Sequence, residues 1–264
     1  MLEIRNLWKT FNPGTVNEKI ALQGINLTLN DGDFVTVIGS NGAGKSTMLN
    51  AVAGVFPVDS GYIGLDGQNM TAKSENRRAA GIGRVFQDPM MGTAATMQIV
   101  ENLALAARRG RFRGLRRGIT RQEREQYREQ LRTLELGLED RMTTKVGLLS
   151  GGQRQALTLL MATLRRPKLL LLDEHTAALD PATAAKVLSL TDKIVREHKL
   201  TTLMITHNMK DAITHGNRLI MMNEGKIIFD VAGEEKASLT KADLLQKFAD
   251  LSGGGLESDR MLLN

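Results

Sequence analysis

Short apolar runs recur along the chain and are separated by longer segments of mixed polarity. Residues 34–38, 169–172 and 204–206 are the clearest of these runs. Runs of this length, bounded by turn residues, indicate buried strands, whereas the longer mixed segments between them indicate helices. Strands that alternate with helices are typical of a mainly parallel sheet. We therefore predict an α/β fold from residue 34 onward.

Two regions depart from this alternation. In residues 1–30, apolar and polar positions alternate on both sides of a loop at Asn12-Pro13-Gly14, which predicts antiparallel strands. Residues 88–160 are largely helical in pattern. Within them, Thr120 and Glu123 have the spacing of a capping box, so a helix is predicted to start there and to run through Leu134.

The residues after the first buried strand fit the phosphate-binding pattern G-x-x-x-x-G-K-[ST]. The match comprises Gly39, Ser40, Asn41, Gly42, Ala43, Gly44, Lys45, Ser46 and Thr47. Backbone amides at the start of the following helix would face an anion. Lys45 is expected to reach the β- and γ-phosphates, and Ser46 to offer its hydroxyl to Mg²⁺. Because a strand precedes the loop and a helix follows it, a glycine-rich turn that binds nothing is the weaker interpretation.

A second motif, Leu149-Ser150-Gly151-Gly152-Gln153, combines a capping box with two glycines. Ser150 and Gln153 have the S-x-x-Q spacing, so a helix is predicted to start here. Gly151 and Gly152 leave the backbone amides accessible at that helix start. Taken alone, the motif would be read as a plain capped helix. A phosphate loop earlier in the same chain favours an anion-binding site instead.

The two motifs together resemble those of the ATP-binding cassette family, whose signature reads LSGGQ. The resemblance covers roughly residues 1–230. It implies a P-loop NTPase fold: a mainly parallel sheet with an N-terminal antiparallel β subdomain and an inserted helical subdomain. We accordingly predict a cassette over residues 1–232, with its helical subdomain at about 88–160, and a C-terminal helical tail over 233–264.

The resemblance assigns catalytic roles to four residues at predicted strand ends. Asp173 is expected to hold Mg²⁺ and Glu174 to act as the general base toward water. Gln87 would lie near Mg²⁺ and the attacking water, and His207 would be the switch histidine. An isolated acidic pair is often a solvated turn, and an isolated histidine is often structural. The order and spacing of the motifs single these residues out.

The resemblance also implies an adenine-stacking residue and a D-loop, and it reveals one position at which this chain departs from the family pattern. Phe11 matches the family's adenine-stacking aromatic; Trp8 is the competitor, and either could instead fill the core. Asp180 lies in a D-loop, which communicates across a dimer. His175 stands where the family usually has proline. It is either an additional proton carrier or, as we favour, a tolerated variant.

One copy of the chain carries one phosphate loop and one signature. In the family these two anion-binding ends do not close on the same ATP; two copies pack head to tail. Each ATP then lies between Lys45 of one copy and Ser150, Gly151 and Gly152 of the other. The expected cofactors are ATP and Mg²⁺, and the first expected partner is a second copy of the chain.

Composition bears on where in the cell a protein of this kind would act. The chain has 264 residues, no cysteine and a net charge of +6. Its N-terminus lacks a signal-peptide pattern, and no apolar stretch approaches the ~20 residues of a membrane span. The basic excess centres on residues 108–117, by default a solvated loop, but in the helical subdomain this run would face permease and anionic lipid. We expect the protein on the cytoplasmic face of the cell membrane.

Two functions compete. The first is solute import through separate permease subunits, with an extracytoplasmic solute-binding protein as indirect partner. The second is a soluble cassette ATPase that acts on nucleic acid or ribosomes. Such proteins usually fuse two cassettes or insert a long coiled coil, and neither pattern occurs here, so no nucleic acid is expected. A P-loop kinase is a weaker third possibility, because the signature argues against it.

Three further segments refine the importer interpretation. Residues 90–97 are small and methionine-rich and follow Gln87, as expected for a groove that takes a permease helix. Together with residues 173–180 they resemble a bacterial subfamily of tryptophan/tyrosine-type amino-acid importers. Thr240 to Leu251 is predicted to form a short capped helix, followed by a flexible stretch at 252–255.

Overall fold

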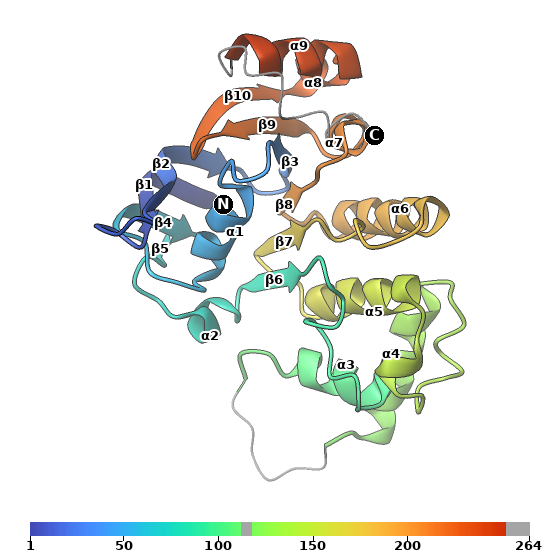
Figure 1. Cartoon of the computed structure of the whole chain (residues 1–264). Helices are drawn as coiled ribbons and strands as arrows, with labels where there is room; N and C mark the ends of the chain where they lie inside the picture. The colour runs from blue at the N-terminus through green and yellow to red at the C-terminus, as the bar shows by residue number, and fades with distance from the viewer. Residues whose placement is uncertain (112–117, 252–264) are drawn as a thin grey trace. The chain divides into compact units, whose positions relative to one another are not determined.

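The computed structural model describes residues 1–111 and 118–251. It consists of two compact units, one formed by Met1–Arg78 with Lys199–Asn264 and the other by Ala79–His198. In Figure 1 the first unit takes in the blue and red ends of the chain, and the second takes in the green and yellow middle.

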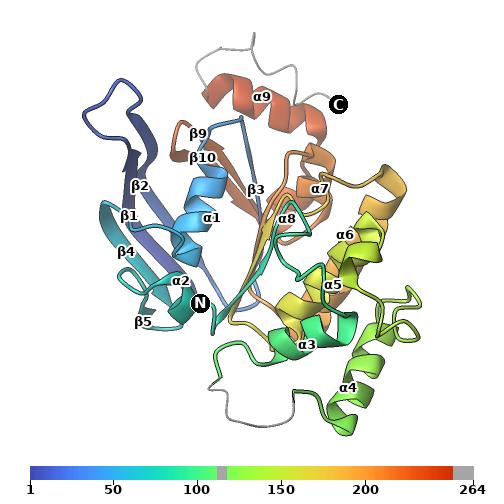
Figure 2. The same cartoon turned by 60° about the horizontal axis from the view of Figure 1, so that its bottom comes forward.

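The first unit begins with the predicted antiparallel sheet. Its strands are β1 (Leu2–Phe11), β2 (Lys19–Leu29), β4 (Ser60–Leu65) and β5 (Gln68–Asn69), in the order β2-β1-β4-β5. All the pairings are antiparallel, which confirms the prediction for residues 1–30. Figure 2 shows β1 and β2 as a long two-stranded ribbon.

A second set of strands in the first unit carries the phosphate loop. The strand β3 (Phe34–Gly39) is buried along its whole length and pairs in parallel with β8 (Thr202–Ile205) and β9 (Arg218–Asn223). Strand β10 (Lys226–Ala232) pairs antiparallel with β9. Helix α1 (Lys45–Ala53) follows β3 directly, so the predicted strand–loop–helix order is confirmed.

Helix α2 (Glu75–Arg78) closes the N-terminal half of this unit through one buried arginine. Arg78 is 2% exposed, and its Nη1 donates to the carbonyls of Ala51 (2.7 Å) and Val52 (2.8 Å) at the end of α1. Burial lowers the pKa of this guanidinium. Its hydrogen bonds thus supply donors in the last turn of α1, where carbonyls no longer have the full set of intrahelical donors.

Three helices complete the first unit: α7 (Met209–Thr214), α8 (Gly233–Ala237) and α9 (Lys241–Leu251). The predicted cap of α9 is confirmed, because Thr240 Oγ1 accepts from the amide of Asp243 at 3.2 Å. Leu244 and Phe248 of α9 are buried in one cluster with Met209 of α7. The stretch at 252–255 lies outside the described residues.

The second unit pairs two parallel strands with helices. Strand β6 (Ile82–Val85) runs parallel to β7 (Leu169–Asp173). The helices are α3 (Ile99–Ala107), α4 (Arg121–Arg132), the short 3-10 helix η1 (Val146–Leu148), α5 (Gly151–Thr163) and α6 (Pro181–His198). The predicted capping box of α4 is confirmed, and the helix ends at Arg132, two residues before the predicted Leu134.

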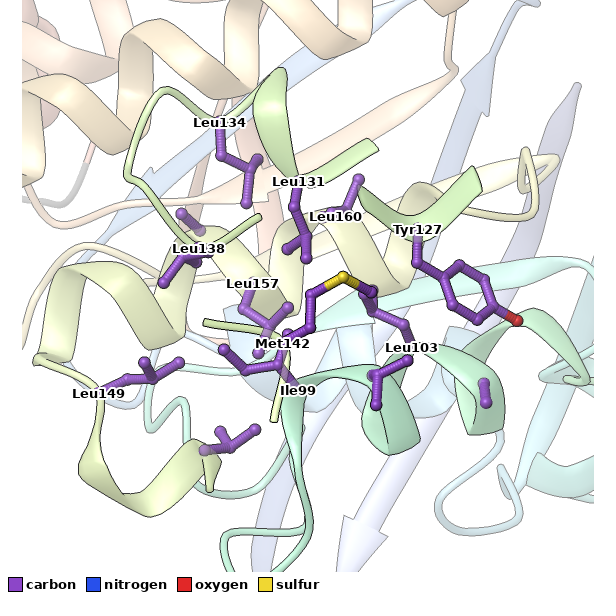
Figure 3. Packing of buried hydrophobic residues seen from close by; sticks show 14 residues of the cluster. Ile99, Leu103, Tyr127, Leu131, Leu134, Leu138, Met142, Leu149, Leu157 and Leu160 are labelled. Atoms are coloured by element: carbon purple, nitrogen blue, oxygen red, sulfur yellow. The ribbon is translucent and has the colours of Figure 1, made fainter. Parts of the chain in front are cut away.

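The helices α3, α4 and α5 share a hydrophobic core (Figure 3). Leu103 of α3, Leu131 of α4 and Leu157 of α5 are each fully buried in it. Close packing of such side chains fixes the orientation of each helix. This core therefore sets the direction in which α5 presents its N-terminus.

The interpretation of residues 108–117 as a solvated loop is wrong for its first two residues. Arg108 donates to the carbonyl of Ala104 and to the carboxylate of Glu123, both at 2.9 Å. Arg109 donates to the carbonyls of Ala162 (3.2 Å) and Arg165 (3.0 Å). Burial, and the nearby charge of Arg165, lower the pKa of Arg109. Residues 112–117 lie outside the described part of the chain.

Candidate nucleotide site

The phosphate loop joins β3 to α1, and two of its glycines, Gly39 and Gly44, leave no room for a Cβ beside neighbouring backbone. Gly44 is the N-cap of α1 with φ 99°, and a Cβ there would lie 2.6 Å from the carbonyl oxygen of Ala21. No side chain caps this helix. The first amides of a helix have no intrahelical partner, so this end offers donors to an anion.

The Lys45 side chain lies along the loop that it follows. Its Nζ donates to the carbonyls of Gly39 (2.7 Å) and Ser40 (2.9 Å), and the residue is 6% exposed. Ser40 is tied in turn to Asn223 of β9, with 3.3 Å between its Oγ and the Asn223 Oδ1. The loop is therefore preorganised with its ammonium group already beside the backbone that would surround a phosphate.

The two candidate adenine-stacking residues differ in their contacts. Phe11, at the end of β1, is half-buried and packs edge-on against Phe56 with ring centroids 5.2 Å apart. The Lys9 ammonium lies 5.4 Å from the Phe11 centroid. Trp8 is 38% exposed, and its indole N–H donates to Asn6 Oδ1 at 2.9 Å. Neither ring fills the core.

His207 lies two residues beyond β8, which ends at Ile205 and not at the histidine itself. The amide of Thr206 donates to the carbonyl of Val37 at 3.1 Å, which continues the β3–β8 pairing to the residue before His207. Asn208, immediately after His207, caps α7 by accepting from the amides of Lys210 and Asp211. His207 is thus held between a strand end and a helix start.

The second unit carries the two carboxylates at the end of β7. Asp173 is its last residue, and Glu174 follows with a left-handed φ of 44°. Arg84 of β6 pairs with Asp173, with 3.5 Å between Nη2 and Oδ2. The same guanidinium lies 4.4 Å above the ring of Phe86, whose neighbour along the chain is Gln87. Nothing in the sequence motifs singles out Arg84, because its partner comes from a strand far along the chain.

His175 is oriented inward and is not a solvent-facing group. It is 2% exposed, and its Nε2 lies 3.1 Å from the Thr191 hydroxyl oxygen of α6. Sequence reasoning missed Thr191 entirely. A signal does exist, because Thr191 lies in the middle of α6, where a buried threonine hydroxyl needs a partner.

The signature segment forms the predicted capping box. The Ser150 Oγ accepts from the amide of Gln153 at 3.3 Å, and the Gln153 Oε1 accepts from the amide of Ser150 at 3.2 Å. Gly152 lies so close to Thr183 of α6 that a Cβ there would overlap the threonine methyl. Asp180 caps α6 by accepting from the Thr183 amide at 3.0 Å. Hydrogen bonds from Thr183 lower the pKa of Asp180.

The segment 90–97 is bonded to the residues that precede the signature. The amide of Val146 donates to the carbonyl of Met97 at 3.0 Å, and the amide of Gly147 donates to that of Ala95 at 2.9 Å. Met91 is 69% exposed, whereas a Cβ at Gly92 would lie 2.7 Å from the Thr158 methyl of α5. Met91 is therefore accessible, whereas Gly92 packs against α5.

The predicted site residues are divided between the two units. The first unit holds Phe11, the loop from Gly39 to Thr47, and His207. The second holds Gln87, Asp173, Glu174, Ser150, Gly151, Gly152, Gln153 and Asp180. In the described residues of the chain, no helix is long and apolar enough to cross a membrane.

Comparisons with known proteins agree with this geometry. A family model described as "ABC transporter" matches residues 22–177. The chain is 45% identical to a tyrosine transport ATP-binding protein of Clostridioides difficile, over 94% of this chain and 98% of that protein. It is 30% identical to a phosphonates import ATP-binding protein of Bacillus cereus, over 99% and 98%.

Other similarities come from polyamine import and from solved structures. A spermidine/putrescine import ATP-binding protein of Haemophilus ducreyi is 34% identical over 87% of this chain and 57% of that protein. A dimeric structure of MJ0796, a bacterial ABC transporter cassette, superimposes with a TM-score of 0.75 at 29% identity, covering 88% and 98% of the two chains. The ADP conformation of MJ1267, an ATP-binding cassette, gives 0.76 at 26% identity, covering 94% and 98%.

Proposed function

We propose, since this chain belongs to the ABC transporter family of ATP-binding subunits, that it hydrolyses Mg·ATP to power solute import through separate permease subunits. The observation that carries this proposal is the α1 N-terminus. It has no side-chain cap, it starts at a glycine for which no other residue has room, and it is followed by a lysine folded onto the loop.

The residues fit both cofactors. Amides at the uncapped helix start and the Lys45 ammonium suit phosphate oxygens. The Ser46 hydroxyl and the Asp173 carboxylate are hard oxygen donors, the kind that Mg²⁺ takes alongside phosphate. Bound Mg²⁺ would neutralise charge on the phosphates. Glu174 would accept a proton from the attacking water at its carboxylate, with Gln87 and His207 orienting that water and the γ-phosphate.

We further propose that two copies share each ATP. The signature helix α5 has closed its own N-terminus with the Ser150–Gln153 box, so it complements a phosphate that another surface already holds. Its glycines Gly151 and Gly152 would let the γ-phosphate of the partner copy approach the backbone. Asp180 would contact the partner copy at the same interface. The dimeric cassette of MJ0796 supports this arrangement.

The transported solute is proposed to be an aromatic amino acid of the tyrosine type. The support is 45% identity with a tyrosine transport ATP-binding protein, against 30–34% with the phosphonate and polyamine relatives. The subunit would work at the cytoplasmic face of the membrane, with a solute-binding protein outside. We also keep the proposed division into a cassette over 1–232, its helical subdomain at about 88–160, and a tail over 233–264.

The alternative of a nucleic-acid or ribosome partner loses part of its support. It rested on the basic excess, whose visible focus is residues 108–117. Arg108 and Arg109 of that run use their guanidinium groups for internal hydrogen bonds. These internal hydrogen bonds leave fewer of their N–H donors for the phosphates of a nucleic acid.

The test of the enzymatic proposal is Glu174→Gln in the full chain. We expect ATP binding close to wild type and turnover lower by on the order of 100-fold or more, because the base is lost while the phosphate loop is intact. Light scattering with ATP and Mg²⁺ should then detect a trapped dimer. Near-normal turnover by Glu174→Gln would remove Glu174 as the base.

Coupling to the permease is tested at Met91. A glutamate at Gly92 would overlap α5, so that substitution would confound folding with docking. Met91→Glu instead adds a charge at an exposed position. We expect it to preserve basal ATPase activity and to abolish tyrosine uptake in reconstituted vesicles, because a buried charge against a permease helix has no partner. Met91→Leu is the control, and full uptake by Met91→Glu would exclude docking there.

A further inference from the structure

The backbone at Glu174 is held in a conformation that glutamate rarely adopts. Its φ of 44° lies in the left-handed region, which costs a residue with a side chain on the order of 1 kcal/mol or more. Such conformations persist where the surrounding structure over-determines them. A local turn supplies part of this constraint, since the amide of Ala177 donates to the carbonyl of Glu174 at 3.0 Å.

The next residue along the chain, His175, provides a connection to a helix. Its ring is buried, at 2% exposure, and its Nε2 lies 3.1 Å from the Oγ1 of Thr191, which is fully buried. Thr191 Oγ1 also lies 2.8 Å from the carbonyl oxygen of Val187, to which it donates. A hydroxyl has a single hydrogen, so toward the imidazole Thr191 is the acceptor and His175 Nε2–H is the donor.

Thr191, which accepts this hydrogen bond, belongs to the well-packed helix α6. Thr191 lies inside α6, whose N-terminus is capped by Asp180 and whose buried face includes Val187, Leu188, Ile194 and Val195. A hydrogen bond between two buried groups is strong relative to one in water, and its loss leaves a buried donor without a partner. The chain directly after Glu174 is therefore tied to a rigid element sixteen residues away.

We propose that His175 is a positioning residue for Glu174: its Nε2–H bond to Thr191 fixes the turn in which Glu174 takes its left-handed backbone, and so aims the Glu174 carboxylate. The inference rests on the proposed role of Glu174 as the base. It differs from both interpretations that the sequence alone left open. A ring that donates to a buried threonine is neither a proton carrier open to water nor a substitution without consequence.

The chain offers matched variants for this test. Thr191→Val removes the hydroxyl at nearly constant shape, whereas Thr191→Ser keeps it. His175→Phe removes the donor, whereas His175→Gln retains an N–H donor. Each variant is purified as the full chain, and its melting temperature, ATP dissociation constant, KM and kcat are measured with Mg²⁺.

We expect Thr191→Val and His175→Phe to lower kcat about tenfold, because a small displacement of a catalytic group has effects of this size or larger. KM and ATP affinity should stay within about twofold, since the phosphate loop is untouched. Thr191→Ser and His175→Gln should restore most of the rate. A purely structural role would instead lower the melting temperature and leave kcat of the folded fraction unchanged, which would overturn the proposal.

The decisive measurement places Thr191→Val in the Glu174→Gln background and compares single-turnover rates. If His175 acts through the Glu174 carboxylate, Thr191→Val slows the wild type and adds nothing once that carboxylate is gone. An equal slowing in both backgrounds would overturn the inference. A normal kcat for Thr191→Val together with slow turnover by Glu174→Gln would also overturn the inference, while leaving Glu174 as the base.

Fast turnover by Glu174→Gln would overturn the proposed function itself. Should Thr191→Val fail to fold, the His175→Phe and His175→Gln pair gives the same comparison.

Discussion

The N-termini of α1 and α5 differ in whether a side chain caps them. Both helices expose amides that lack intrahelical partners. At α1 the N-cap is Gly44, which has no side chain that could accept from these amides. At α5 the N-cap is Ser150, whose hydroxyl accepts from the amide of Gln153, while the Gln153 side chain accepts from the amide of Ser150.

The difference indicates which end binds phosphate first. A helix end without a side-chain cap and with a lysine folded beside it can donate its first amides to an anion, whereas a capped end already gives one of them to its own cap. We therefore expect α1 to bind ATP in the isolated chain. The α5 end should contribute only after another copy has presented its nucleotide.

Lys45→Ala tests whether the α1 end binds the phosphates of ATP, and we expect it to have the largest effect of these variants. It removes an ammonium that would contact phosphate, and charged hydrogen bonds contribute roughly 1.5–3 kcal/mol each. We expect ATP affinity to fall on the order of 100-fold. Titration with a fluorescent ATP analogue measures it, with Ser150→Ala as the variant that should bind normally. A Lys45→Ala protein within a few-fold of wild type would mean that the loop amides suffice.

Gly152→Ala should disturb the α5 side by a steric route. The new methyl would overlap the Thr183 methyl of α6, and overpacking of this kind costs about 1–3 kcal/mol. Urea unfolding should show the loss. Thr183→Ser removes the clashing methyl, so the double variant should regain most of the stability. Gly151→Ala is the milder control, because its Cβ would lie 3.3 Å from Leu179. Equal losses at both glycines would contradict the steric explanation.

These contacts also show what the sequence could predict. Both capping boxes were predictable because Thr120 with Glu123, and Ser150 with Gln153, lie within one turn of each other. The strand–loop–helix at β3 was predictable for the same local reason. The burial of Arg109 was not, because its acceptors, Ala162 and Arg165, lie more than fifty residues away. The sequence of a charged run gives no sign of the distant carbonyl groups to which it donates in the folded protein.

In the candidate site, too, local motifs were predictable and long-range partners were not. Motif spacing pointed to Asp173, Glu174 and His207 at strand ends; β7 ends at Asp173 as expected, whereas β8 ends two residues before His207. The partners that hold Asp173 and its neighbour His175 are Arg84 and Thr191, which come from other elements of the second unit. No pattern within a single segment contains such a pairing. The catalytic assignments themselves stay predictions until the variants above are measured.

Ser150→Ala tests whether the α5 cap is structural as well as functional. Loss of a serine N-cap costs about 1 kcal/mol. We expect urea unfolding to show a loss of this size, ATP binding by the isolated chain to be unchanged, and ATP-dependent dimerisation in the Glu174→Gln background to weaken. Ser150→Thr, which keeps a hydroxyl cap, should retain stability. Unchanged dimerisation by Ser150→Ala would show that the glycine amides alone serve the partner's phosphate.

The smallest effect is expected at the capping box of α4, which differs from that of α5 in carrying a charge. The box of α4 has Glu123 where α5 has the neutral Gln153. A hydrogen bond from the Thr120 amide at 2.7 Å, together with Arg108, lowers the pKa of Glu123. A carboxylate whose pKa is lower in the folded state stabilises the protein above its unfolded pKa. That stability is lost as the pH falls through the folded pKa.

Glu123→Gln should therefore cost about 0.5–1 kcal/mol at pH 7, a size typical of a capping carboxylate near a helix start. The difference from wild type should shrink as the pH is lowered below about 4.5, where the unfolded carboxyl protonates. Urea unfolding of both proteins across this range measures it. Gln153→Ala at the α5 box should show no such pH dependence, because its amide does not titrate. A difference between wild type and Glu123→Gln that stays constant down to pH 3 would mean that the Glu123 charge contributes nothing and that its packing alone stabilises α4.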